Sequence, residues 1–306
     1  MFLLAKYTLL YTVVLMLVAL GGMFSERSGI INIALEGIMV IGGLIGVIAI
    51  QLMPEGASAL MIVVCSISAA AIAGMLYASL LAFASINLNA DQTIGGTALN
   101  MLATALAMVI AKGVNGSASP KLDFSNRAFV YEFGPLTVNA FLFVGIVILI
   151  ASYVVLYKTR LGLRLRACGE HPQAADSVGI NVYKMRYIGV LISGALGGIG
   201  GMAYIIPSVS SWNFEVGVSG AGFLALAVMI FGQWKPFRIF FAAMFFALFK
   251  SLANIASSIP MMAALGWTQN MYNMIPFIAS MIILAFTSKK SRAPKAEGIP
   301  YDKGSR

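Results

Sequence analysis

The stretch TRLGLRLRACGEHPQAADSVGI, residues 159–180, is a polar segment in the middle of a strongly apolar chain. Its first twelve residues carry three arginines and one glutamate, whereas the whole chain of 306 residues is 60% hydrophobic and only 10% charged. The mean hydropathy of +0.91 lies far above that of soluble domains, which must cover their surface with polar groups. The sequence therefore indicates an all-α, polytopic integral membrane protein, in which this segment is a loop between membrane spans.

Apolar runs of spanning length lie on both sides of this loop, at about 20 residues per helix. They predict about nine transmembrane helices, within a range of eight to ten, near residues 7–24, 29–50, 58–85, 92–112, 137–157, 186–207, 218–234, 236–257 and 271–287. The stretch 208–222 is a candidate re-entrant segment. The first run has only Lys6 ahead of it and no clear cleavage site after it, which favours a retained helix over a signal peptide.

The distribution of charge predicts the orientation of the chain. Loop 158–186 and tail 288–306 together hold twelve of the twenty basic residues, and such residues favour the cytoplasmic side. Four predicted spans separate the two, an even number, so both fit the cytoplasm and the N-terminus is expected outside. We therefore expect a transmembrane domain over 1–287 and a basic cytoplasmic tail over 288–306. Membrane orientation explains the net charge of +9 better than nucleic-acid binding does.

The polar loop contains start and stop signals for a short helix. Pro172 suits the first position of a helix, and Glu170 suits the N-terminal end of the helix dipole. Gly179 is placed to end the helix after about two turns. Arg164 and Arg166 precede it and are expected at the lipid headgroups. Small residues such as Ala175 favour a docking surface for a partner protein, although a solvated loop that only orients the chain is the alternative.

Polar side chains inside the predicted spans are candidates for a translocation path, because such groups are costly in lipid. Asn32 and Glu36 lie one helical turn apart, and Asn100 lies deep in the fourth span. They could offer hydrogen bonds to a polar solute. For Glu36 we favour the alternative of a structural hydrogen bond that ties a broken helix to its neighbour. Neither Cys65, Cys168 nor the single histidine, His171, suggests a disulfide framework or a metal site, and no cofactor is expected on this chain.

Four stretches of the chain resemble the permease subunits of bacterial ATP-binding cassette importers for branched-chain amino acids, ribose-type sugars and nucleosides. They are the loop just described, ERSGIINIALEGIMVIGG (26–43), GAGFLALAVMIFGQWKPF (220–237) and SRAPKAEGIPYDKGSR (291–306). The tail and the turn within 220–237 resemble the nucleoside branch, of guanosine or uridine type. The resemblance implies a permease in the bacterial inner membrane that works with a second related permease, a cassette ATPase and an extracytoplasmic substrate-binding lipoprotein.

The residues themselves agree with an ATPase that resides on a separate partner protein. The chain has no Gly-Lys dipeptide and so lacks the phosphate-binding loop, which places ATP and Mg on a partner and makes this chain a transport subunit rather than an enzyme. Loop 158–186 would then receive the force of ATP hydrolysis.

Two other functions are also consistent with the sequence. One is an ion-coupled secondary transporter with Glu36 and Asp91 as proton or sodium sites, although intramembrane charge is sparse. Another is the same cassette role for sugars or branched-chain amino acids. Faint similarity between 34–43 and 225–233, which run in opposite directions in this topology, suggests an inverted repeat.

Overall fold

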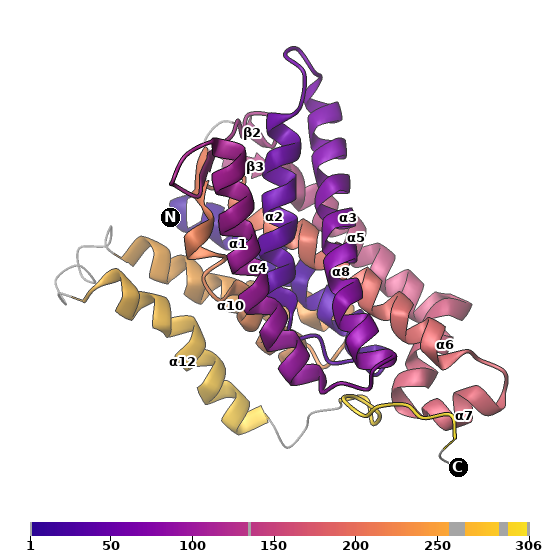
Figure 1. The fold of residues 1–306 in the computed structure, drawn as a ribbon. Helices are drawn as coiled ribbons and strands as arrows, with labels where there is room; N and C mark the ends of the chain where they lie inside the picture. Colours follow the sequence, from indigo (N-terminus) through magenta and orange to yellow (C-terminus); the bar gives the residue numbers. More distant parts are fainter. Residues whose placement is uncertain (1, 134–135, 257–266, 288–292, 305–306) are drawn as a thin grey trace.

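The computed structural model describes residues 2–133, 136–256, 267–287 and 293–304, and these form a mostly helical bundle (Figure 1). The longer helices are α1 (Phe2–Arg27), α2 (Leu35–Gln51), α3 (Ala59–Ile86), α4 (Gln92–Asn115), α5 (Ala140–Lys158), α8 (Val182–Ile205), α10 (Pro236–Ile255) and α12 (Gln269–Thr287). Shorter helices are α6 (Arg160–Glu170), α7 (Pro172–Ser177), the 3-10 turn η1 (Phe214–Val216) and α9 (Ala221–Phe231).

Helices α1 and α8 form the centre of the bundle, and both have more buried residues than any other helix of the described chain. Helices α3, α4 and α5 instead present apolar side chains outward, among them Leu76, Met101, Val109 and Val147, each exposed by more than 60%. An outer surface of this composition suits lipid, where the helices satisfy their own backbone groups. The sequence prediction of a helical membrane protein is thus confirmed.

Glycines bring α2, α3 and α8 into close contact. A Cβ atom added at Gly42 of α2 would lie 2.2 Å from the Cα atom of Gly198 in α8, and one added at Gly74 of α3 would lie 2.2 Å from the carbonyl oxygen of Gly194. Only hydrogen side chains allow the three backbones to approach this closely. Gly194 and Gly198, which lie four residues apart in α8, therefore serve packing inside the chain.

Six helices in the described residues are long and apolar enough to cross a membrane, and α2 and α9 are shorter apolar helices. The expectation of about nine complete spans therefore goes beyond what these residues show. Helix α9, predicted as a full span over 218–234, has 11 residues, about 17 Å at 1.5 Å per residue against about 30 Å of hydrocarbon. Its start is fixed because Ser219 and Gly220 have left-handed φ angles of 53° and 75°.

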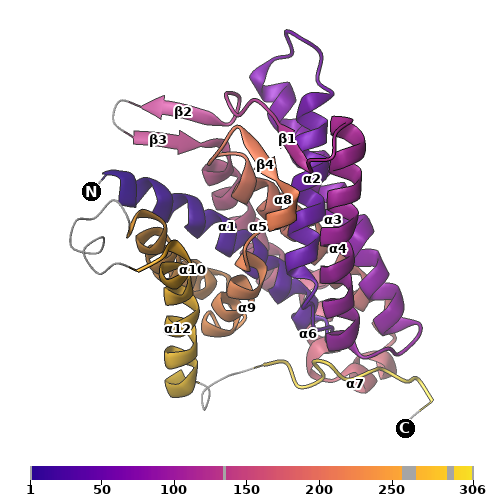
Figure 2. The same ribbon diagram turned by 60° about the vertical axis from the view of Figure 1, so that its left-hand side comes forward.

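Two small sheets qualify the all-α prediction. Strand β1 (Lys121–Asp123) pairs antiparallel with β4 (Ser211–Asn213), and β2 (Val130–Phe133) pairs antiparallel with β3 (Leu136–Asn139). Figure 2 shows these strands at the end of the bundle where the N-terminus lies, while α6, α7 and the C-terminal segment lie at the opposite end. The polar loop and the described part of the tail thus share one end, as the charge distribution predicted.

Candidate coupling and translocation sites

The polar loop, which is the candidate for receiving force from ATP hydrolysis, folds into two helices, α6 and α7, together called the coupling unit below. The hydroxyl of Thr159 accepts a hydrogen bond from the Gly162 N–H and caps the start of α6. Helix α7 has Pro172 at its first position, and Gly179, with a φ angle of 82°, follows its end. The predicted start and end of α7 are right. Helix α6 was not anticipated, because the arginines and glycines of 160–170 suggested only a flanking loop.

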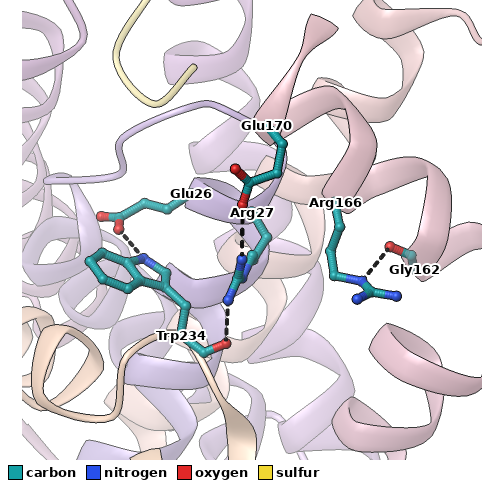
Figure 3. Close-up of polar contacts among 6 residues, drawn as sticks. All are labelled: Glu26, Arg27, Gly162, Arg166, Glu170 and Trp234. Carbon is teal, nitrogen blue, oxygen red and sulfur yellow. Dashed lines mark hydrogen bonds and ion pairs between the residues drawn. The ribbon is translucent and has the colours of Figure 1, made fainter. Parts of the chain in front are cut away.

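Two of the predicted coupling residues contact neighbouring elements (Figure 3). The carboxylate of Glu170, the last residue of α6, lies 3.5 Å from the guanidinium of Arg27, the last residue of α1. The guanidinium of Arg166 lies over the ring of Tyr157 at 4.9 Å, and its Nε donates to the Gly162 carbonyl at 3.4 Å. Arg164 is exposed. The unit is therefore attached to α1 through Glu170 and to α5 through Arg166.

The two alanines of α7 have opposite placements. Ala174 is exposed, as is Val178 after the end of the helix, which keeps 74% of its surface. Ala175 keeps only 3% and packs in a small core with Cys168 of α6 and Tyr301 of the tail. The outward surface that a partner could touch is therefore formed by residues such as Ala174 and Val178, and Ala175 supports it from behind.

The turn between α9 and α10 packs against the end of α1 beside the coupling unit. The indole N–H of Trp234 donates to the Glu26 carboxylate, and Arg27 donates to the Trp234 carbonyl at 3.3 Å (Figure 3). Glu26 is 4% exposed and Trp234 is 2% exposed. Sequence reasoning missed all three residues, although an acid and a base at the end of the first apolar run were a visible signal.

Glu36 joins the starts of two short helices. Its side chain lies in the first turn of α2, and its two carboxylate oxygens accept the backbone N–H groups of Gly220, at 2.8 Å, and Gly222, at 2.6 Å. These donors belong to the start of α9, where a helix favours negative charge. Lys250 of α10, which keeps 7% of its surface, adds a favourable electrostatic interaction. The sequence could have flagged Lys250 as a lone cation in an apolar run.

The side chains of Asn100 and Asn32 also form hydrogen bonds near the start of α2. The side chain of Asn100 accepts from the Gly37 N–H at 2.7 Å and donates to the Ile33 carbonyl at 2.9 Å. Asn32 is fully buried and donates to the hydroxyl of Ser193 at 2.8 Å. Asp91, the other candidate ion site, caps α4 by accepting the N–H groups of Thr93 and Ile94.

Glu36 and Asn100 line one groove, and Asn32 lies outside it. The groove has a volume of about 590 Å³, and its wall combines polar and apolar side chains from α2, α4 and α9: Glu36, Thr97, Asn100, Met101, Thr104, Ala105, Met108 and Phe223. Hydroxyl and amide groups beside an aromatic ring suit a solute with both polar and flat apolar parts.

The described residues form a helical bundle with a two-helix unit at one end, the architecture of a multi-pass membrane protein. A family model described as "Branched-chain amino acid transport system / permease component" matches residues 4–285. The chain belongs to this family of permease subunits.

Curated relatives agree along nearly the whole chain. The guanosine ABC transporter permease protein NupQ of Bacillus subtilis is 40% identical over 98% of this chain and 96% of its own length. The nucleoside ABC transporter permease protein NupC of Lactococcus lactis is 40% identical over 96% of this chain and 95% of its own. A second Lactococcus protein, the nucleoside ABC transporter permease protein NupB, is 28% identical over 62% of this chain and 53% of its own.

Proposed function

We propose that the chain is the membrane subunit of an ATP-binding cassette importer that moves nucleosides across the bacterial inner membrane. The observation that carries this proposal is the 40% identity, over nearly the full length of both chains, to permeases of guanosine and nucleoside transporters. The chain would supply the path, and a partner ATPase that binds ATP and Mg would supply the energy.

Three protein partners follow from this role. A second, related permease would complete the path, and the presence of two nucleoside permeases, NupC and NupB, in one Lactococcus strain supports such a pair. A cassette ATPase would dock on the exposed side of α7, and a substrate-binding lipoprotein would deliver the solute from outside. Closure of the ATPase would then push on the coupling unit as a rigid body.

In this proposal the chain crosses the membrane about nine times, with two of the crossings made by broken helices. Residues 28–34 would carry the chain from the end of α1 to the start of α2, and residues 206–220 would lead from α8 to the start of α9. The two broken helices begin at the contact of Glu36 with Gly220 and Gly222 and continue toward opposite ends. Such a pair is the arrangement that an inverted repeat produces.

The groove beside Glu36 is the proposed half of the translocation path on this subunit. The α4 side of the groove is exposed, with Thr97 and Met101 at its surface, so a second permease could close it. Asn100 and Glu36 would shape the groove while their polar atoms hold the backbone of α2 and α9. Asn32, buried against Ser193, would support the same region from behind.

An ion-coupled carrier is the competing function, and the test separates the two. The chain is reconstituted in proteoliposomes with its second permease, ATPase and lipoprotein, and uptake of radiolabelled guanosine, ribose and leucine is measured with ATP or with an ion gradient. We expect ATP-dependent guanosine uptake only. Uptake by the chain alone under a sodium or proton gradient would overturn the importer, and uptake of leucine or ribose in place of guanosine would overturn the substrate.

A further inference from the structure

The C-terminal segment 293–302, called the strap below, lies against three elements at the coupling end of the bundle. The N–H of Ala296 donates to the carbonyl of Gly169 in α6 at 2.8 Å, and the N–H of Gly298 donates to the carbonyl of Gly29 at 3.2 Å. From α8, the buried Arg186 donates to the carbonyl of Ile299 at 3.0 Å. Figures 1 and 2 both show this segment running beside α7. The family model, which matches 4–285, ends before it.

Tyr301, near the end of the strap, fills the core behind α7. Its side chain keeps 4% of its surface and packs with residues of α6, α7 and the start of α8: Cys168, Ala175, Val182 and Met185. The ring meets that of Tyr183 edge-on at 5.4 Å, and the guanidinium of Arg186 lies 5.9 Å from it. Tyr301 has the largest side chain of this core, which includes Ala175 of α7, and it shares a side-chain hydrogen bond with Asp176 of the same helix.

The middle of the strap is attached to α1 through a pair of acids. The carboxyl groups of Glu297 and Glu26 share a side-chain hydrogen bond, and Glu26 also accepts the indole N–H of Trp234. Two carboxyl groups can bond in this way only when one of them keeps its proton. Burial raises the pKa of Glu297, and in the shared bond Glu26 is the protonated donor from which Glu297 accepts.

We propose that the strap is a positioning element for energy coupling. It seats α7 through Tyr301, and it connects α7 to the α1–α2 linker (28–34) through Gly298 and to the end of α1 through Glu297. The proposal rests on the proposed function, in which α7 receives the closure of the ATPase. The linker that Gly298 contacts leads into α2 and Glu36, so the strap provides a non-covalent route from α7 to the broken helices. Without it, α7 would keep its covalent links to α6 and α8 but would yield under the push of the ATPase.

Cys168 gives a local readout of the strap. Its thiol is fully buried beneath Tyr301, and burial raises its pKa to about 11, so it should react slowly with maleimides. In a Cys65→Ser background Cys168 is the only cysteine. Removal of the Tyr301 side chain should raise the rate of labelling by N-ethylmaleimide about tenfold, because the local core then opens more often.

The test compares four chains in the full transporter complex: wild type, Tyr301→Ala, Tyr301→Phe and a chain that ends after Lys295. A chain that ends after Lys303 keeps the whole strap and serves as the matched control. We measure Cys168 labelling, co-purified ATPase, and nucleoside transported per ATP hydrolysed. The Ala variant and the shorter chain should retain the ATPase but lose about tenfold in transport per ATP. The Phe variant keeps the ring and loses only the hydrogen bond of the hydroxyl with Asp176 of α7, so its loss should be smaller.

The outcomes separate the strap from the proposed function. Wild-type transport per ATP in Tyr301→Ala, or unchanged protection of its Cys168, would overturn the strap while leaving the importer intact. Absence of ATP-driven uptake by the wild-type complex would instead overturn the importer. If the shorter chain fails to accumulate in the membrane, the two point variants still decide the question.

Discussion

The guanidinium of Arg27 lies 3.5 Å from the carboxylate of Glu170, although 143 positions separate the two residues in the sequence. Each is the last residue of its helix, α1 and α6, so the contact attaches the first helix of the bundle to the coupling unit. Arg27 also donates to the carbonyl of Trp234, which begins the turn into α10. Three distant segments thus meet at one cation next to the surface proposed for ATPase docking.

Reversing the charge at Glu170 should impair uptake. In Glu170→Lys, a second cation would face Arg27, whose side chain is only 12% exposed, and the repulsion would displace α6 from α1. Glu170→Gln removes the charge alone, and because Glu170 is 45% exposed it should cost less than about 1 kcal/mol. Uptake and ATPase co-purification are measured for both. Glu55→Lys, the same charge change at an exposed turn, is the control. Full uptake by Glu170→Lys would argue against this contact.

The contact between Glu36 and α9 is tested at Gly222. A Cβ atom added there would lie 2.5 Å from the backbone nitrogen of Glu36. Gly222→Ala should therefore force α2 and α9 apart and lower the free energy of unfolding by about 1–3 kcal/mol. Gly113→Ala is the matched control, because Gly113 lies in α4 with no neighbouring atom within 4 Å of an added Cβ. There alanine should stabilise the helix by up to about 1 kcal/mol. Thermal unfolding in detergent measures both, and equal midpoints would contradict the close contact.

Hydropathy could predict where the helices lie but not where two of them break. An apolar run is a property of composition, and 218–234 is as apolar as a complete span. The break before α9 depends on the left-handed backbone of Ser219 and Gly220 and on a carboxylate 184 positions away, Glu36. Such a long-range hydrogen bond leaves no periodic signal in the sequence.

In the coupling unit, too, some features depend on neighbouring residues and others on residues far away in the sequence. The ends of α7 were predictable because Pro172 and Gly179 act within the backbone of their own turn. Helix α6 had a signal that was overlooked, since Leu161, Leu165 and Cys168 repeat at helical spacing. The inward placement of Ala175 was not predictable, because it depends on Tyr301, which approaches from the opposite end of the sequence.

The two alanines of α7 should respond differently to the same substitution. Ala174 is exposed on the proposed docking side, so Ala174→Arg should leave the amount and thermal stability of the chain unchanged while ATPase co-purification and uptake are lost. Ala175 is 3% exposed, so Ala175→Arg would bury an unpaired cation and should destabilise the coupling unit itself. Binding of the ATPase is measured by pull-down and stability by thermal unfolding. Undiminished ATPase binding in Ala174→Arg would show that α7 does not dock.

The attachment of the strap to α1 through Glu297 and Glu26 should weaken as pH rises. Burial raises the pKa of Glu297 above that of an exposed glutamate, so the folded state binds a proton more tightly than the unfolded state. The resulting stabilisation is complete below the unfolded pKa, about 4.3, and it is lost as pH rises through the folded pKa. Glu297→Gln keeps a neutral hydrogen-bond partner for Glu26 at every pH, because an amide can both accept and donate.

We therefore expect the unfolding temperature of the wild type to fall relative to that of Glu297→Gln as the pH is raised from about 5 to 9. Measuring the difference between the two chains removes the titration of the groups outside the pair and leaves that of Glu297 with Glu26, which is coupled to it. Arg27, the cation beside the pair, is the same in both chains. A temperature difference that stays constant across this range would mean that Glu297 and Glu26 hold no shared proton, and that the strap is attached through its backbone hydrogen bonds and Tyr301 alone.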